Sequence, residues 1–197
     1  TITLGNGSND VLELVARAFV TSSNSVIFSQ HAFAVYPIVT QAIGAQAIVT
    51  PATNWGHDLL AMQAAIRDNT RLIFIANPNN PTGTWIDKIS LKTFLEAVPE
   101  QILVVVDEAY FEYAIDQPDY PNCLEWISTY PNLIVTRTFS KAYGLAGLRV
   151  GYAISHPDVA NLLNRVRQPF NVNSLALVAA TAALTDTEHL NQSIVLN

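Results

Sequence analysis

The sequence predicts a three-layer α/β/α fold, with helices on both faces of a seven-stranded, mostly parallel sheet that contains one antiparallel strand. Runs rich in valine, isoleucine and leucine alternate with amphipathic segments along the chain, which is the pattern of a parallel sheet covered on both sides. No linker, repeat or low-complexity stretch interrupts the sequence, so we expect one domain at 1–197. One connection between strands is too short for a parallel crossover, which predicts the antiparallel strand.

Four strand–helix pairs are expected in the first half of the chain. Short runs dominated by apolar residues indicate buried strands, and they lie at 1–5, 25–30, 45–51 and 71–77. The segments between and after them carry apolar residues at helical spacing, and they lie at 9–20, 34–44, 57–68 and 89–98. This regular alternation indicates crossovers between parallel strands.

The second half continues the pattern with one exception. Further strands are expected at 101–109, 132–139 and 148–155, and further helices at 123–129, 157–168 and 174–186. Only about eight residues connect 132–139 to 148–155, whereas a parallel crossover needs roughly a dozen or more. We therefore expect 148–155 to run antiparallel to the other strands.

Composition excludes several classes of function. The net charge of -6 disfavours binding to nucleic acid or to an anionic membrane surface, and no apolar run reaches the ~18 residues of a membrane span. A single cysteine, Cys123, allows no internal disulfide and, with no signal-peptide pattern, predicts a cytoplasmic protein. The four histidines lack metal-ligand spacing, so no metal site is expected.

Polar segments follow the carboxyl ends of the expected parallel strands, where open α/β sheets bind ligands. These segments are GNGSND, QHAF, NPNNPTG, DEAY and TFSK. In the first, Gly5 and Gly7 permit a tight turn, and the helix that opens at Ser8 and Asn9 offers free N–H groups to an anion such as phosphate. An ordinary strand–helix turn with a good N-cap is the alternative, and neither a dinucleotide fingerprint nor a Walker loop is present.

Two segments suggest a ring-shaped, cationic ligand. Asp107 ends a very apolar strand, where a carboxylate needs a partner such as a cationic ring nitrogen, and Tyr110 lies three residues further on. The prolines of NPNNPTG make a stiff loop that holds the amide of Asn80 at a fixed point. A capping or metal-binding aspartate and a simple strand-stopping turn are the alternatives. Strand alternation turns Glu108 the other way, which favours a structural role.

Lys141 is the only one of three lysines in an apolar, glycine-rich setting. Partial desolvation there makes an amine nucleophilic toward carbonyls, although a surface lysine is the ordinary alternative. Thr138 and Ser140 point to one side of an extended segment, and Arg149 returns on the antiparallel neighbour with a fork that suits phosphate. A reactive lysine, a partner for a ring nitrogen, groups for a ring hydroxyl and a phosphate cup describe a pyridoxal phosphate site.

The strings GNGSND, NPNNPTG, DEAYFEY, TFSKAYGLAGLRVGY and RQPFNVN, taken in order along the chain, resemble the fold-type-I pyridoxal-phosphate aminotransferases. The resemblance implies that Lys141 binds the cofactor covalently and, once freed, acts as general base and acid. It implies that Asp107 pairs with the ring nitrogen and that Asn80 and Tyr110 hold the ring oxygen. Phe33 stands where the family stacks an aromatic residue on the ring. The implied phosphate ligands are Ser8, Asn9, Thr138, Ser140 and Arg149.

DEAYFEY with PFNVN favours the branch that transfers the amino group of histidinol phosphate to 2-oxoglutarate, in histidine biosynthesis. Threonine-phosphate decarboxylases share most of the pattern, and another class I or II aminotransferase remains open. So does a transcription regulator with an aminotransferase-like sensor domain. The resemblance further implies a homodimer, with an N-terminal segment and a C-terminal small domain that we do not find here. We therefore expect this chain to be the cofactor-binding large domain, with little or no turnover alone.

Overall fold

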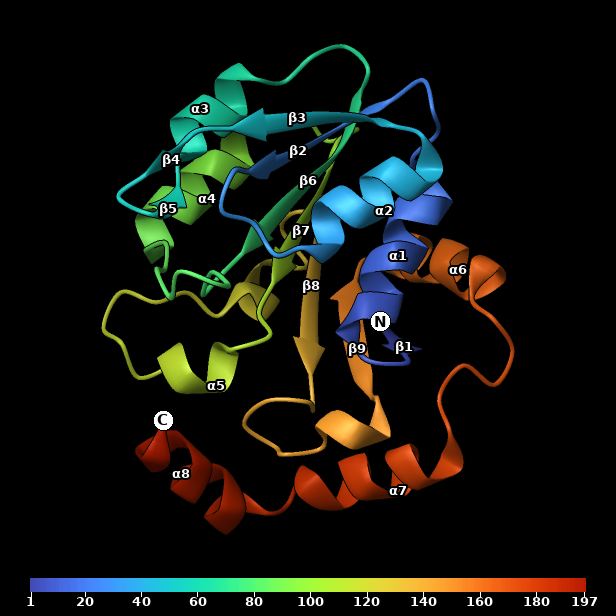
Figure 1. Ribbon diagram of the computed structural model, residues 1–197, viewed down its shortest axis with the longest axis vertical. Coiled ribbons are helices and arrows are strands. Elements are labelled where there is room, and N and C mark those ends of the chain that lie inside the picture. Colours follow the sequence, from blue (N-terminus) through green and yellow to red (C-terminus); the bar gives the residue numbers. More distant parts are fainter.

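The computed structural model describes all residues, Thr1–Asn197, and contains one seven-stranded sheet with helices on both faces (Figure 1). The strand order is β1-β9-β8-β7-β6-β2-β3. The strands are β1 (Ile2–Gly5), β2 (Ser25–Ser29), β3 (Gln46–Thr50), β6 (Thr70–Ala76), β7 (Leu103–Asp107), β8 (Leu133–Thr138) and β9 (Gly151–Ser155). Only β9 runs against its neighbours, β1 and β8. The predicted fold class and the predicted antiparallel strand are confirmed.

The helices form two layers, one on each face of the sheet (Figure 1). On one face α1 packs against α2 and α6, and on the other α3 packs against α4. These helices are α1 (Ser8–Phe19), α2 (Val35–Ile43), α3 (Leu59–Ala64), α4 (Lys88–Ala97) and α6 (Pro157–Val166). The short α5 (Phe111–Ala114), α7 (Ser174–Ala183) and α8 (Thr187–Leu196) lie toward the end of the sheet where β8 points. No helix combines the length and the apolar character that crossing a membrane requires.

Alternation along the strands divides the core into two clusters. Phe74 and Val105 lie in the cluster under α1 and α2, whereas Ile73, Ile75 and Val106 lie in the cluster under α3 and α4. Successive strand residues face opposite sides of a sheet, so Asp107 continues the face of Val105 and its neighbour Glu108 the face of Val106. This alternation decides the surroundings of both carboxylates.

Several local features differ from the sequence-based expectations, and the helices α5 and α8 were not expected. A small hairpin of β4 (Ala52–Thr53) and β5 (Gly56–His57) follows β3; its strands are too short to form an apolar run. The helix expected at 123–129 is a 3-10 turn, η1 (Cys123–Trp126). The helix expected at 57–68 is shorter, with Asp58 capping α3 through a hydrogen bond from the Ala61 N–H.

Candidate active site

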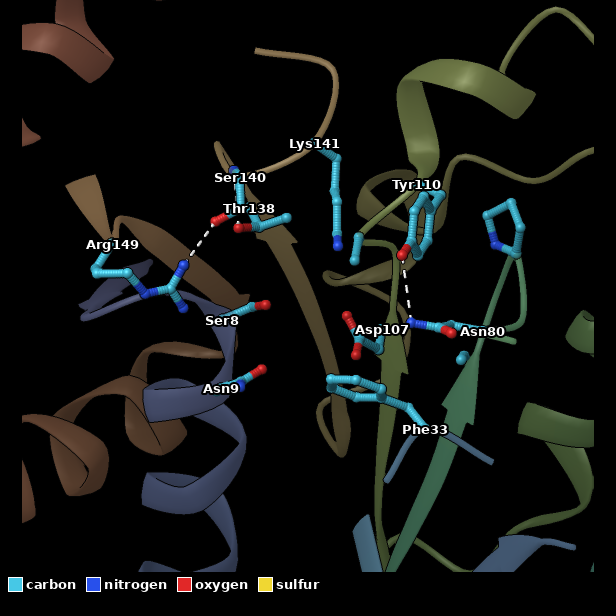
Figure 2. A pocket seen from close by; sticks show the side chains of 13 residues that line it. Ser8, Asn9, Phe33, Asn80, Asp107, Tyr110, Thr138, Ser140, Lys141 and Arg149 are labelled. Carbon is cyan, nitrogen blue, oxygen red and sulfur yellow. Dashed lines mark hydrogen bonds between the residues drawn. The ribbon is translucent and has the colours of Figure 1, made fainter. Parts of the chain in front are cut away.

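One pocket at the carboxyl ends of the parallel strands brings together all ten residues singled out from the sequence (Figure 2). They come from the start of α1, the segment before α2, the last residues of β7 and β8, and the loops that follow β6, β7 and β8. The ten are Ser8, Asn9, Phe33, Asn80, Asp107, Tyr110, Thr138, Ser140, Lys141 and Arg149; Ala76, Pro78 and Ala109 complete the lining. Because parallel strands end at one edge, residues more than 100 positions apart converge there.

Asp107 forms the floor of the pocket as the last residue of β7, and it is only 4% exposed. The Tyr36 hydroxyl donates to Oδ2 and the Thr136 hydroxyl donates to Oδ1, each at 2.9 Å. Burial raises the pKa of the Asp107 carboxyl above its ordinary value, while these donors, the Ala109 N–H and the charge of Lys141 oppose the rise. Asp107 forms no ion pair with any side chain, so its charge is free for a cation in the pocket.

Asn80 and Tyr110 lie on one side of the pocket, where the Asn80 amide donates to the Tyr110 hydroxyl at 3.3 Å (Figure 2). The loop that carries Asn80 is held by its own side chains. The Asn77 amide oxygen accepts from the Ile86 N–H at 2.8 Å, and the Asn79 amide donates to the Thr82 hydroxyl at 2.8 Å. An amide and a phenol are therefore presented together at a fixed place.

Lys141 follows β8, and its side chain extends into the pocket toward Asp107 (Figure 2). Its Nζ lies 5.0 Å from the centroid of the Tyr110 ring, within the range of a cation–π contact. The residue as a whole is exposed. The partial desolvation expected for its amine therefore stays a prediction.

The other side of the pocket gathers an arginine and two hydroxyl groups at the start of α1. Arg149 Nη1 donates to the Ser140 hydroxyl at 3.2 Å, and the Ser140 N–H donates to the Thr138 hydroxyl at 3.1 Å. A Cβ on Gly7 would collide with the Arg149 guanidinium, and one on Gly151 would collide with the backbone N of Ser8. The two glycines thus let an arginine and a helix N-terminus approach the same point, an arrangement that favours a bound anion.

Phe33 closes the pocket beside Asp107 (Figure 2). It precedes α2, and its carbonyl accepts the Tyr36 N–H at 3.0 Å. The rings of Phe33 and Tyr36 meet edge to face, with centroids 5.9 Å apart. The start of α2 therefore supplies both a flat apolar ring to the pocket and a hydroxyl to the carboxylate below it.

Sequence reasoning missed Tyr36 and Thr136, the two hydroxyl donors to Asp107. Tyr36 lies in an apolar helix, where a tyrosine is indistinguishable from a core residue. Thr136 is the cross-strand register partner of Asp107, and this pairing follows only from the order of strands in the sheet. A polar residue inside a run such as LIVTRTF was the available signal.

Glu108 turns to the opposite face of the sheet, as strand alternation predicts. Its Oε2 accepts from Arg137 Nε at 2.9 Å and from Nη2 at 2.7 Å, and its Oε1 accepts from the Cys123 N–H at 3.0 Å. Arg137 also lies over the Phe111 ring at 3.4 Å. This ion pair is buried and does not line the pocket.

The family model for class I and II aminotransferases matches residues 1–195. The chain belongs to this family. The match confirms the family resemblance inferred from the sequence motifs.

Relatives within the aminotransferase family share much of this sequence. Histidinol-phosphate aminotransferase 2 of Pseudomonas fluorescens (strain Pf0-1) is 66% identical over 196 residues, and histidinol-phosphate aminotransferase 1 of Idiomarina loihiensis is 60% identical. Each alignment covers 100% of this chain and 53% of the relative. The chain thus spans about half the length of the curated relatives it matches.

Solved structures agree with this assignment. The crystal structure of histidinol-phosphate aminotransferase from Sinorhizobium meliloti in complex with pyridoxal-5'-phosphate matches with a TM-score of 0.93 and 34% identity, over 98% of this chain and 53% of that one. L-threonine-O-3-phosphate decarboxylase from Porphyromonas gingivalis matches with a TM-score of 0.81 and 25% identity, over 98% and 58%.

Proposed function

We propose that the pocket binds pyridoxal 5'-phosphate and that the chain is the large domain of a histidinol-phosphate aminotransferase. The observation that carries the proposal is one pocket that combines a lysine amine, a buried carboxylate without a cation partner, and an anion cup. The cofactor offers each of these a matching group: an aldehyde, a basic ring nitrogen and a phosphate. The close approach of the Arg149 guanidinium to Gly7 and of the Ser8 backbone N to Gly151 gathers donors that suit a phosphate.

The residues divide the binding task by position. Arg149, Ser140, Thr138 and the N–H groups of Ser8 and Asn9 hold the phosphate, and Phe33 lies against the ring face. Asn80 and Tyr110 donate to the ring oxygen. Asp107 lies at the floor, where its carboxylate pairs with a protonated ring nitrogen in a site of low dielectric.

When bound, the cofactor supplies an aldehyde carbon that bonds to amines and a cationic ring that withdraws electrons from that carbon. Lys141 would hold the cofactor through its Nζ and would give up that bond to the amino group of a substrate. Once free, the Lys141 amine would act as general base and acid for proton transfer at the substrate. Asp107 keeps the ring nitrogen protonated, and Tyr110 fixes the ring relative to Nζ.

The amino donor is proposed to be L-histidinol phosphate and the acceptor 2-oxoglutarate. The relatives at 57–66% identity carry the histidinol-phosphate aminotransferase name along the whole of this chain, which supports the proposal. We further propose a cytoplasmic homodimer whose remaining segments cover Lys141 and bind the carboxylate or phosphate of the substrates. Alone, the chain should turn over little substrate.

Half-reactions of the complete enzyme test the substrate. Loaded with cofactor, it is mixed separately with histidinol phosphate and with threonine phosphate. We expect the absorbance of the amine form of the cofactor to rise with histidinol phosphate and no carbon dioxide to form with threonine phosphate. Release of carbon dioxide from threonine phosphate would instead assign a decarboxylase, the activity named for the Porphyromonas gingivalis neighbour.

A further inference from the structure

Two buried hydroxyl groups hold the carboxylate of Asp107, one on each oxygen. Tyr36 Oη donates to Oδ2 and Thr136 Oγ1 donates to Oδ1, both at 2.9 Å. Neither Tyr36 nor Thr136 has exposed surface. Both donors are neutral, so they fix the carboxylate without cancelling its charge.

Rigid elements set the positions of both donors. Tyr36, in the first turn of α2, stacks on Phe74 with centroids 4.5 Å apart and planes 3° from parallel. Its backbone N–H and its ring both contact Phe33, which lines the pocket. Thr136 lies in β8, directly across from Asp107 in β7. The Asp107 carboxylate is thus hydrogen-bonded by a residue of helix α2 on one oxygen and by a residue of strand β8 on the other.

We propose that Tyr36 and Thr136 are positioning residues that aim the Asp107 carboxylate into the pocket and keep it ionised for a cationic ring nitrogen. The inference rests on the proposed function and extends it to residues that do not touch the cofactor. Hydrogen bonds to the charged form favour that form, and their effect grows in a buried site. Preorganised donors on rigid elements also remove the need for Asp107 to reorient when the ring binds.

The titratable groups around Asp107 are Tyr36 from α2, Tyr110 from the loop after β7 and Lys141 from the loop after β8, with Arg149 across the pocket. Burial raises the pKa of Asp107, and the two hydroxyl donors oppose the rise. Burial and the nearby Asp107 raise the pKa of Tyr36 well above its ordinary value, so its phenol keeps the proton that it donates. Removing either hydroxyl therefore moves the Asp107 pKa further upward.

The test is a carboxyl titration of the complete enzyme without cofactor. Aspartate side chains carry a carbon-13 label at Cγ, and Asp107→Asn assigns the signal in the NMR spectrum. Tyr36→Phe and Thr136→Val should each raise the midpoint by about one to two pH units, the equivalent of one hydrogen bond to a charged group. Thr136→Ser keeps the hydroxyl and should restore the wild-type midpoint.

Cofactor affinity gives a second readout. Tyr36→Phe should weaken binding of pyridoxal phosphate about 10-fold or more, and it should add no further loss in an Asp107→Asn background, because it acts through Asp107. The matched control is Tyr130→Phe, which removes a tyrosine–carboxylate hydrogen bond to Glu96 at an exposed site. This control should leave both the midpoint and the affinity unchanged.

A folded Tyr36→Phe or Thr136→Val protein with the wild-type midpoint would overturn the inference. If Tyr36→Phe does not fold, Thr136→Val and its serine counterpart decide the question on the same readout. A wild-type enzyme that takes up no pyridoxal phosphate would overturn the proposed function instead. The titration without cofactor would still decide whether the two hydroxyls control the Asp107 carboxyl.

Discussion

Asp107 and Glu108 are neighbours in sequence and both are buried, yet their surroundings differ completely. Glu108 is paired through two hydrogen bonds with Arg137 on the α4 face of the sheet. Asp107, on the α2 face, is held by two hydroxyls and has no cation partner in the chain. One charge is cancelled by an ion pair between neighbouring strands, whereas the other has no ion-pair partner in the chain. Burial alone therefore does not separate the two carboxylates; the missing counter-charge of Asp107, together with its place in the pocket, does.

The largest effect on activity is expected from Lys141→Ala, a substitution in the pocket, made in the complete enzyme. General acid–base catalysis alone contributes about 10²- to 10⁴-fold, and the covalent attachment is lost as well. We expect kcat/KM to fall at least about a thousandfold, while the urea midpoint of the enzyme without cofactor stays unchanged because Lys141 forms no ion pair in the fold. Lys88→Ala, a substitution at an exposed lysine that bears a surface ion pair, is the control and should keep full activity.

Arg137→Ala tests the buried ion pair with Glu108, on the face of the sheet opposite to Asp107. Leaving Glu108 buried without its cation costs about 3–5 kcal/mol of unfolding free energy, measured by urea denaturation. Adding Glu108→Gln in the same chain should recover part of that loss, because no unpaired charge then remains. If Arg137→Ala cost less than about 1 kcal/mol, the pair would not be a structural link between β7 and β8.

Asp107→Asn should have the opposite effect to Arg137→Ala: a larger loss of activity and a smaller loss of stability. The amide keeps the size of the side chain but loses the charge, so a charge-assisted contact of about 1.5–3 kcal/mol disappears. We expect kcat/KM to drop roughly 10- to 100-fold in the complete enzyme, with less loss of stability than Arg137→Ala causes. Near-wild-type activity would contradict the pairing of Asp107 with a ring nitrogen.

Glu112 is a third carboxylate to compare with Asp107 and Glu108. It is buried in α5, and its Oε2 has no hydrogen-bond partner. Burial raises the pKa of Glu112 above its ordinary value of 4.5. The folded state then binds the proton more tightly than the unfolded state, so this group's contribution to stability falls as pH rises from 4.5 through the folded pKa. Urea denaturation at several pH values should show this fall in the wild type and not in Glu112→Gln. If the free energy of unfolding changed with pH in the same way in both proteins, the raised pKa of Glu112 would be contradicted.

The order of elements was predictable because each strand is a clear apolar run and each following segment has helical spacing. The positions of Asn80, Asp107 and Lys141 at one edge followed from the parallel sheet. The partners of Asp107 did not follow, since Tyr36 is 71 residues away in an apolar helix. The pairing of Glu108 with Arg137 required the register of β7 and β8. The desolvation of the Lys141 amine stays a prediction, because an apolar neighbourhood in sequence does not show which side of a loop is covered.

The central claim is that the amine of Lys141 carries the cofactor within this pocket. The most direct test adds pyridoxal phosphate to the complete enzyme, reduces it with borohydride and maps the modified peptide by mass spectrometry. We predict a single modified residue, Lys141, and loss of the modification when Lys141 is replaced by alanine. Modification at Lys88 or Lys92 alone, or no modification at all, would contradict the claim.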